Sequence, residues 1–85
     1  MSYEVILTAT ARREFYSLTP RMQERMAAAV AVLAENPRPP HSLKLVHREG
    51  WRLRVGDYRM LYTVDDGARV VTVIAIGHRR EVYRG

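Results

Sequence analysis

Hydrophobic positions recur along this chain with two different periods. Residues 3–8 are rich in β-branched and aromatic side chains, which predicts a first strand. Within residues 10–18 and 20–35, apolar side chains recur every three or four positions, as they do on one face of an α-helix. Between these segments, Thr19 can act as a helix N-cap and Pro20 can occupy the first helical position. The pattern therefore predicts a helical hairpin with a very short connection.

The second half of the chain has the pattern of strands. Three prolines within residues 37–40 end the helical pattern, because proline continues neither a helix nor a strand ladder. Residues 51–55, 58–64 and 68–76 are then rich in aromatic and β-branched side chains and are separated by turn residues. The predicted fold class is α+β: an N-terminal strand, a helical hairpin and a three-stranded antiparallel meander, with the helices packed on one face of the sheet. We expect residues 1–85 to form a single domain.

The first turn of the meander determines which side chains share a face. Gly56 followed by Asp57 suits a two-residue type II′ turn, which pairs Arg54 with Arg59. Side chains then alternate between the two faces with a period of two. The apolar face, which we expect to carry the helices, comprises Trp51, Leu53, Val55, Tyr58, Met60 and Tyr62. The opposite face, called the arginine face below, comprises Arg52, Arg54, Arg59 and Leu61.

The second turn is less strongly determined by its residues. We expect a three-residue loop at 65–67 with Gly67 in the left-handed conformation, which pairs Arg59 with Val73. A two-residue loop would exchange the faces of the last strand. In the preferred register, the arginine face also receives Val71, Val73, Ala75, Gly77 and Arg79, and the core receives Val70, Thr72, Ile74 and Ile76.

The basic residues are unevenly distributed. The chain has 14 basic and 9 acidic side chains, for a net charge of +5. Residues 43–85 hold nine of the basic and five of the acidic side chains, and Lys44 is the one lysine in the chain. A basic half in a small domain predicts an anionic partner, either nucleic acid or an acidic protein. The alternative is a genome that uses arginine wherever lysine would serve.

Several classes of protein are not expected. The absence of cysteine excludes disulfides, iron–sulfur clusters and cysteine-based zinc sites, and the three histidines lack a metal-ligand spacing. The longest apolar run, residues 26–34, is about half of what a bilayer span needs. The N-terminus does not have the pattern of a signal peptide. We therefore expect a cytoplasmic protein with no metal, no cofactor and no membrane contact.

Two segments are specific enough to indicate a family. They are residues 50–62 (GWRLRVGDYRMLY) and residues 77–83 (GHRREVY), with an acidic turn and a Val/Ile strand between them. Together with the opening strand, the helical hairpin and the proline-rich exit, they resemble the RelE/ParE toxin superfamily of type II toxin–antitoxin systems, in particular its RelE-like branch. RelE-type toxins enter the ribosomal A site and cut mRNA there, whereas ParE-type toxins act on DNA gyrase and do not cut RNA.

The resemblance also implies a set of site residues. The RNase branch has two basic residues before the first hairpin turn, an arginine after it, another arginine after the glycine that ends the last strand, and a tyrosine near the C-terminus. The catalytic residues implied in this chain are Arg52, Arg54, Arg59, Arg79 and Tyr83. The first two positions are often lysine in the family, where one can serve in proton transfer. A guanidinium stays protonated at neutral pH, so these two arginines are expected to stabilise charge and leave the general base unassigned.

The expected chemistry needs no metal, because RNA carries its own nucleophile in the 2′-hydroxyl. Guanidinium groups bind phosphate oxygens bidentately and stabilise the charge that develops during attack. Tyr83 is a candidate for base stacking or acid–base work. His78, the one histidine near the cluster in the sequence, is a candidate for proton transfer, although alternation directs it to the face opposite Arg79. Further RNA contacts are expected from Lys44, His78, Arg80 and Arg84.

The resemblance thus implies an mRNA interferase that a cognate antitoxin holds inactive. The expected partners are that antitoxin, mRNA in the ribosomal A site and ribosomal RNA, with a monomeric toxin that oligomerises only through the antitoxin. An acidic, partly disordered antitoxin segment would cover the arginine face, with exposed Val71 and Val73 as its apolar contacts. Two alternatives stay open: a ParE-like gyrase inhibitor without RNase activity, and a member that binds antitoxin but cuts RNA poorly.

Overall fold

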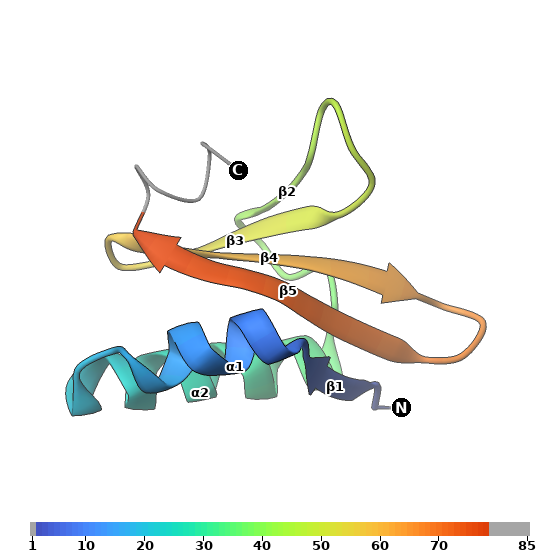
Figure 1. Ribbon diagram of the computed structural model, residues 1–85. Coiled ribbons are helices and arrows are strands. Elements are labelled where there is room, and N and C mark those ends of the chain that lie inside the picture. The colour runs from blue at the N-terminus through green and yellow to red at the C-terminus, as the bar shows by residue number, and fades with distance from the viewer. Residues whose placement is uncertain (1, 79–85) are drawn as a thin grey trace.

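The computed structural model describes residues 2–78, which form two helices and one five-stranded sheet. In chain order the elements are β1 (Glu4–Leu7), α1 (Ala9–Tyr16), α2 (Pro20–Glu35), β2 (Ser42–Lys44), β3 (Trp51–Val55), β4 (Tyr58–Asp65) and β5 (Val70–His78). The sheet order is β1-β5-β4-β3-β2, and β1 runs parallel to β5 while the other pairs are antiparallel. Both helices lie on one face of the sheet (Figure 1), which confirms the predicted α+β class.

The helix boundaries follow from local capping. The Thr8 hydroxyl accepts a hydrogen bond from the backbone N–H of Ala11 (3.1 Å) and begins α1. The Thr19 hydroxyl accepts one from the N–H of Met22 (3.3 Å) and begins α2, with proline in its first turn. Helix α2 ends before Asn36, as the proline-rich exit predicts.

The proline-rich exit leads into a strand that the sequence pattern does not predict. This strand is β2 (Ser42–Lys44), which pairs with β3 so that Leu43 lies opposite Arg52. The backbone reaches this position through His41, whose φ of 77° is in the left-handed region. The carbonyl of Pro37 accepts a buried hydrogen bond from the Tyr62 hydroxyl (2.7 Å), and this contact attaches the exit to the sheet. The predicted three-stranded meander is therefore part of a larger sheet.

The β3–β4 hairpin has the predicted register. Arg54 lies opposite Arg59 and Leu53 lies opposite Met60, on either side of the Gly56-Asp57 turn. The apolar face of this hairpin packs toward the helices, and its most buried members are Met60 and Tyr62. Burial of Tyr62 raises the pKa of its hydroxyl above the usual value. The predicted division of this hairpin into an apolar face and an arginine face is confirmed.

The β4–β5 hairpin differs from the prediction. Its register pairs Arg59 with Gly77, not with Val73, and a longer loop joins Asp65 to Val70. Within that loop the residue with positive φ is Arg69 (58°), not Gly67. The ladder also contains a bulge, because Leu61 lies opposite Ala75 and Tyr62 lies opposite Val73, which leaves Ile74 as an extra residue.

The bulge changes the face assignment of half of β5. Val71 and Val73 are fully buried in the core beneath the helices, so their predicted exposure on the arginine face is wrong. Val70 and Thr72 lie on the opposite face from these valines and are only half-buried, so their predicted place in the core is also wrong. Beyond the bulge, Ile76 is buried in the core, as predicted.

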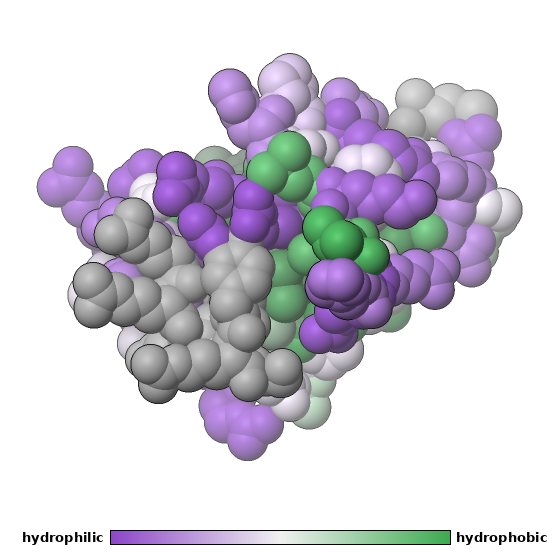
Figure 2. All heavy atoms as spheres, turned by 90° about the horizontal axis from the view of Figure 1, so that it is seen from above, coloured by the Kyte–Doolittle hydropathy of each residue, from purple (hydrophilic) through white to green (hydrophobic). Residues whose placement is uncertain are grey.

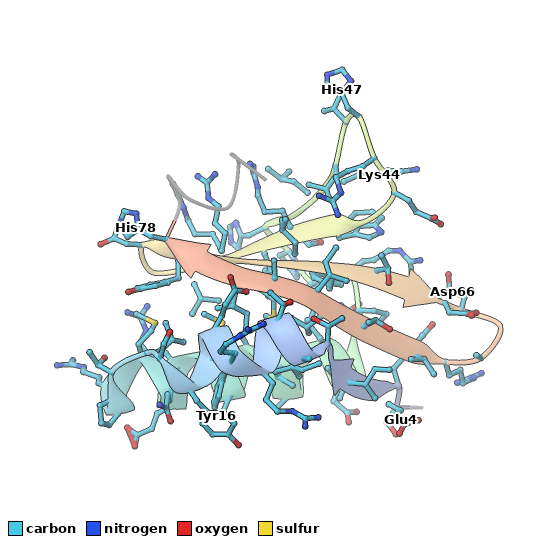
Figure 3. All side chains as sticks on the ribbon, viewed as in Figure 1. Glu4, Tyr16, Lys44, His47, Asp66 and His78 are labelled. Carbon is cyan, nitrogen blue, oxygen red and sulfur yellow. The ribbon has the colours of Figure 1, made fainter. Side chains whose placement is uncertain are left out.

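One end of the sheet is held by a polar cluster. Arg38 of the proline-rich exit forms a bidentate pair with Asp66 of the β4–β5 loop, at 3.2 and 2.7 Å, and the same carboxylate accepts a hydrogen bond from Tyr3 (2.7 Å). The guanidinium of Arg38 also lies 5.4 Å from the ring centre of Trp51. These hydrogen bonds, first from Arg38 and then from Tyr3, lower the pKa of Asp66 from 3.8 to about 2. Asp66 and His78 mark opposite ends of the sheet in Figure 3.

Candidate nucleic-acid interface

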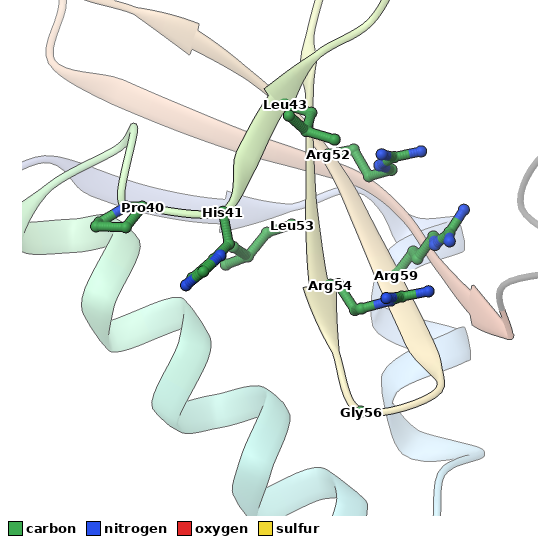
Figure 4. A pocket seen from close by; sticks show the side chains of 8 residues that line it. All are labelled: Pro40, His41, Leu43, Arg52, Leu53, Arg54, Gly56 and Arg59. Atoms are coloured by element: carbon green, nitrogen blue, oxygen red, sulfur yellow. The ribbon is translucent and has the colours of Figure 1, made fainter.

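Three arginines project from the sheet on the side away from the helices. Arg52 and Arg54 come from β3, and Arg59 comes from β4 directly opposite Arg54. In Figure 4 the three guanidinium groups point in the same direction from the two neighbouring strands. Like charges at directly opposed positions of a ladder repel each other. The arrangement follows from the hairpin register and concentrates positive charge on one side of the sheet.

These arginines line an open pocket of about 640 Å³. All of the charged side chains that line it are arginines, and Arg54 is exposed while Arg52 and Arg59 are half-buried. The complete lining is Pro40, His41, Leu43, Arg52, Leu53, Arg54, Gly56 and Arg59. Seen from the side of the sheet opposite the helices, the described atoms are predominantly hydrophilic, with small apolar patches (Figure 2).

The surroundings of Arg59 are more enclosed than those of Arg54. Its Nε atom is shielded from solvent. Leu61, two residues further along β4 on the same face, is only 5% exposed. On β5, the residue opposite Arg59 is Gly77, so β5 places no side chain opposite this arginine. Arg59 therefore occupies a more enclosed position than Arg54.

Strand β2 contributes an apolar side chain to the arginine face. Leu43 pairs with Arg52, and 52% of Leu43 is exposed beside that arginine. Neighbouring Lys44 pairs with Trp51, so the register directs it to the other face of the sheet, away from the three arginines. Lys44 and His47 lie on the β2–β3 hairpin, which projects from the body of the molecule (Figure 3).

The histidines are arranged differently from the sequence-based expectation. His78 lies opposite Tyr58 at the end of β5, and their rings meet edge to face with centres 5.7 Å apart. That position is on the apolar side of the hairpin, away from the arginine face, as alternation predicts. His41 lines the pocket that Arg52, Arg54 and Arg59 line, so the expectation that His78 is the one histidine near the cluster is wrong. The His41 ring points away from the three guanidinium groups (Figure 4).

Sequence reasoning missed His41 and Leu43 because they belong to the exit and to β2. A three-residue strand after three prolines has no readable periodicity. Four predicted site residues lie outside the described residues: Arg79, Arg80, Tyr83 and Arg84.

The arrangement is suited to binding phosphate. Each guanidinium presents a planar fork of donors that matches two phosphate oxygens, and three such forks on one face can bind adjacent phosphates or a single phosphate with developing charge. Guanidinium groups serve here as hydrogen-bond donors and not as proton acceptors. Within residues 2–78, no group of three or more His, Asp or Glu side chains is placed to hold a metal ion.

Comparison with known proteins identifies the family of this chain. The family model described as "ParE toxin of type II toxin-antitoxin system, parDE" matches residues 5–83. The chain belongs to this family, within the RelE/ParE superfamily. Toxin RelG of Mycobacterium tuberculosis (strain ATCC 25618 / H37Rv) is 36% identical to this toxin over 99% of both chains. Toxin RelE of the same strain is 39% identical over 96% of this toxin and 87% of that protein.

The fold comparison agrees with the sequence comparison. A chain of the RelBE2 toxin–antitoxin complex of M. tuberculosis superposes with a TM-score of 0.83 at 29% identity, covering 93% of this toxin and all of that chain. The superfamily expected from the two sequence motifs is therefore confirmed. No helix within the described part of the toxin is long and apolar enough to cross a membrane.

Proposed function

We propose that this toxin is a ribosome-dependent mRNA endoribonuclease that stops translation and is neutralised by a cognate antitoxin. The observation that carries the proposal is the set of three guanidinium groups pointing the same way from β3 and β4, on the side of the sheet that the helices leave open. The similarity to toxins named RelG and RelE supports the same branch of the superfamily.

The proposed reaction requires no metal ion. The 2′-oxygen of the RNA attacks the adjacent phosphorus, the bond from phosphorus to the 5′-oxygen breaks, and the leaving oxygen takes up a proton. Arg52, Arg54 and Arg59 bind the phosphate and stabilise the additional negative charge as it develops. Arg79 is proposed as a fourth phosphate contact, and Tyr83 is proposed to stack on a base or to move a proton. The residue that removes the 2′-proton is not assigned.

The antitoxin is proposed to act by covering the same arginines. The similar M. tuberculosis chain was solved in a toxin–antitoxin complex. An acidic antitoxin segment would meet the guanidinium groups of the arginine face, and Leu43 is an apolar contact beside them. Rim charges of this kind mainly raise the association rate and make it sensitive to salt. Antitoxin and RNA should therefore exclude each other from this face.

A second candidate function has one specific observation in its favour. The matching family model is named for ParE toxins, and the resemblance implies that toxins of this branch act on DNA gyrase. In that case the arginine face would bind a protein and no RNA would be cut.

Primer extension on translated messages after a brief pulse of toxin expression separates the two candidates. Cuts in phase with codons, which disappear when translation is blocked, would support the mRNA endoribonuclease. Intact messages together with a DNA-damage response would support gyrase inhibition. The Arg54→Ala variant should abolish the phased cuts, while Arg21→Ala, at an exposed position of α2, should leave them unchanged. A purified toxin–antitoxin complex that cuts as fast as the toxin alone would contradict the proposed competition.

A further inference from the structure

Strand β5 has different neighbours along its two halves. Its first half pairs with β1, and the ladder ends where Leu7 meets Val73. Beyond this point helix α1 lies beside β5 on the side that β1 occupies in the first half (Figure 1). The backbone groups on this edge of β5 therefore need partners that are not part of a strand.

Side chains at the two ends of α1 supply these partners. The Thr8 hydroxyl donates a hydrogen bond to the carbonyl of Ile74 (3.3 Å). Near the other end of the helix, Oε1 of Glu14 accepts a hydrogen bond from the backbone N–H of Ile76 (2.8 Å). Helix α1 is therefore attached to the edge of β5 at two points, two residues apart along the strand.

The Thr8 contact is made at the bulge, and the Glu14 contact is made two residues beyond it. Ile74 is the extra residue that places Val73 toward the helices and yet leaves Gly77 opposite Arg59 on the arginine face. A bulge interrupts the ladder locally, so strand pairing alone holds this segment weakly. The hydrogen bonds from Thr8 and Glu14 compensate for that loss on the free edge.

Helix α1 itself gives no reason for a carboxylate at this position. Glu14 lies in the last turn of the eight-residue helix, where negative charge interacts unfavourably with the helix dipole. Its half-buried side chain is instead directed to a backbone N–H of the sheet. Glu14 therefore contributes through β5 and not through the stability of α1.

We propose that Glu14 is a positioning residue for the arginine face. By holding the N–H of Ile76, it fixes the next residue, Gly77, opposite Arg59 and so sets the space in which the Arg59 guanidinium meets a phosphate. The catalytic consequence rests on the proposed endoribonuclease function. The geometric consequence does not, and it can be tested without RNA.

Three substitutions separate the hydrogen bond from the charge. Glu14→Ala removes the acceptor, and Glu14→Asp keeps the charge but withdraws the carboxylate by one methylene. Glu14→Gln keeps an acceptor oxygen at the original length and removes the charge. Glu24→Ala, at an exposed position of α2, is the matched control for loss of a glutamate from a helix.

Nuclear magnetic resonance of the labelled toxin tests whether the surroundings of Gly77 and Arg59 change in these variants. In Glu14→Ala and Glu14→Asp we expect the Gly77 amide and the Arg59 Nε–Hε signals to shift, and the Ile76 amide to exchange with solvent at least about tenfold faster. Glu14→Gln and Glu24→Ala should resemble the wild type. Amides in the centre of β3 should keep their shifts in all four variants, which shows that the fold is retained.

Single-turnover cleavage of ribosome-bound mRNA measures the effect of these substitutions on the proposed reaction. Displacing a phosphate-binding group by a fraction of an ångström lowers the rate at saturation more than it weakens binding, so we expect a loss of about tenfold or more in Glu14→Ala and Glu14→Asp. The toxin concentration at half-maximal rate should change little. Glu14→Gln should restore the rate to within about threefold of the wild type.

Several outcomes would overturn the inference. Unchanged Gly77 and Arg59 signals in Glu14→Ala would show that the contact does not position the site. An equal loss of rate in Glu14→Gln would show that the charge matters and not the hydrogen bond. Unfolding of both Glu14→Ala and Glu14→Asp would make the contact a requirement of the whole fold. If the wild type cuts no RNA, the proposed function fails, while the resonance pattern still decides the role of Glu14.

Discussion

The β3–β4 and β4–β5 hairpins share strand β4 but distribute their side chains in different ways. In β3–β4, a two-residue turn is followed by an unbroken ladder, and alternation from the turn places the arginines on one face and the apolar side chains on the other. In β4–β5, residues 66–69 separate the paired ends and Ile74 interrupts the ladder. The regular hairpin presents the side chains that its turn dictates. The bulged hairpin follows the core, because both Val71 and Val73 are buried beneath the helices.

The largest expected effect comes from making the second hairpin regular. Deleting Ile74 would remove the bulge, and either Val71 and Val73 would leave the core or Gly77 would turn toward the helices. Exposing two buried valines costs about 3–6 kcal/mol, a large part of the stability of a small domain. We expect a largely unfolded protein by circular dichroism and urea titration. Deletion of exposed Ala68 from the loop is the control, and an equal loss there would contradict the role of the bulge.

The next effect concerns the function that we propose for the regular hairpin. Arg59→Ala should lower mRNA cleavage about 10²-fold, the usual scale for losing one contact to transition-state charge. Arg59→Lys should recover only part of the rate, because an ammonium group lacks the planar fork. The measurement is a single-turnover rate on ribosome-bound mRNA, with Arg21→Ala as the control. Full activity of Arg59→Ala would show that the arginine face is not the site.

Two glycines next to these hairpins are expected to differ in how well they tolerate an added side chain. Gly50, directly before β3, has a φ of 130°, and an added Cβ would lie 2.9 Å from the carbonyl oxygen of Tyr62. Gly50→Ala should therefore lower the free energy of unfolding by about 1–3 kcal/mol. Gly67, in the β4–β5 loop, has an ordinary backbone conformation and open surroundings. Gly67→Ala should therefore change the free energy of unfolding by less than about 0.5 kcal/mol. Urea titration of both variants tests this difference, and the reverse order of effects would refute it.

The smallest effect is a pH dependence at the loop of the bulged hairpin. The pKa of Asp66 is lowered from 3.8 to about 2 by Arg38 and Tyr3, so the folded state favours the ionised carboxylate. Its stabilising contribution is complete above pH 3.8 and is lost as the pH falls toward about 2. The effect should be small, because this ion pair is largely exposed.

Thermal melting between pH 2 and 5 measures this contribution. Asp66→Asn should flatten the loss of stability over that interval, because the variant carries no carboxylate to protonate. Asp57→Asn removes the same charge from the turn of the regular hairpin and is the matched control. Identical profiles for the two variants would show that the contacts of Asp66 do not couple the loop to the rest of the sheet.

The elements that sequence reasoning places correctly are those with local causes. Thr19 and Pro20 begin α2 through contacts within one helical turn, and Gly56-Asp57 sets the β3–β4 register through a two-residue turn. The positions of Arg52, Arg54 and Arg59 on one face follow from that turn alone. Their proposed role in RNA cleavage is not a matter of register, and it stays a prediction until the cleavage experiments are done.

The remaining features depend on residues that are distant in the chain. Strand β2 follows an exit whose Pro37 carbonyl accepts a hydrogen bond from Tyr62, 25 residues away. Its three residues are too few to show a strand pattern. His41 reaches the arginine pocket by the same route. The bulge at Ile74 is supported by Thr8 and Glu14 across separations of 66 and 62 residues.

The sequence by itself therefore determined the fold class, the start of α2 and the arginine face. These follow from periodicity, capping, turn geometry and alternation, which are all local in the chain. Only the tertiary structure decided how many strands the sheet has and which side chains of β5 face the helices, including the buried Val71 and Val73. The physical reason is that burying two valines stabilises the fold more than an unbroken ladder would. Distant side chains form hydrogen bonds with backbone groups at and beyond the bulge.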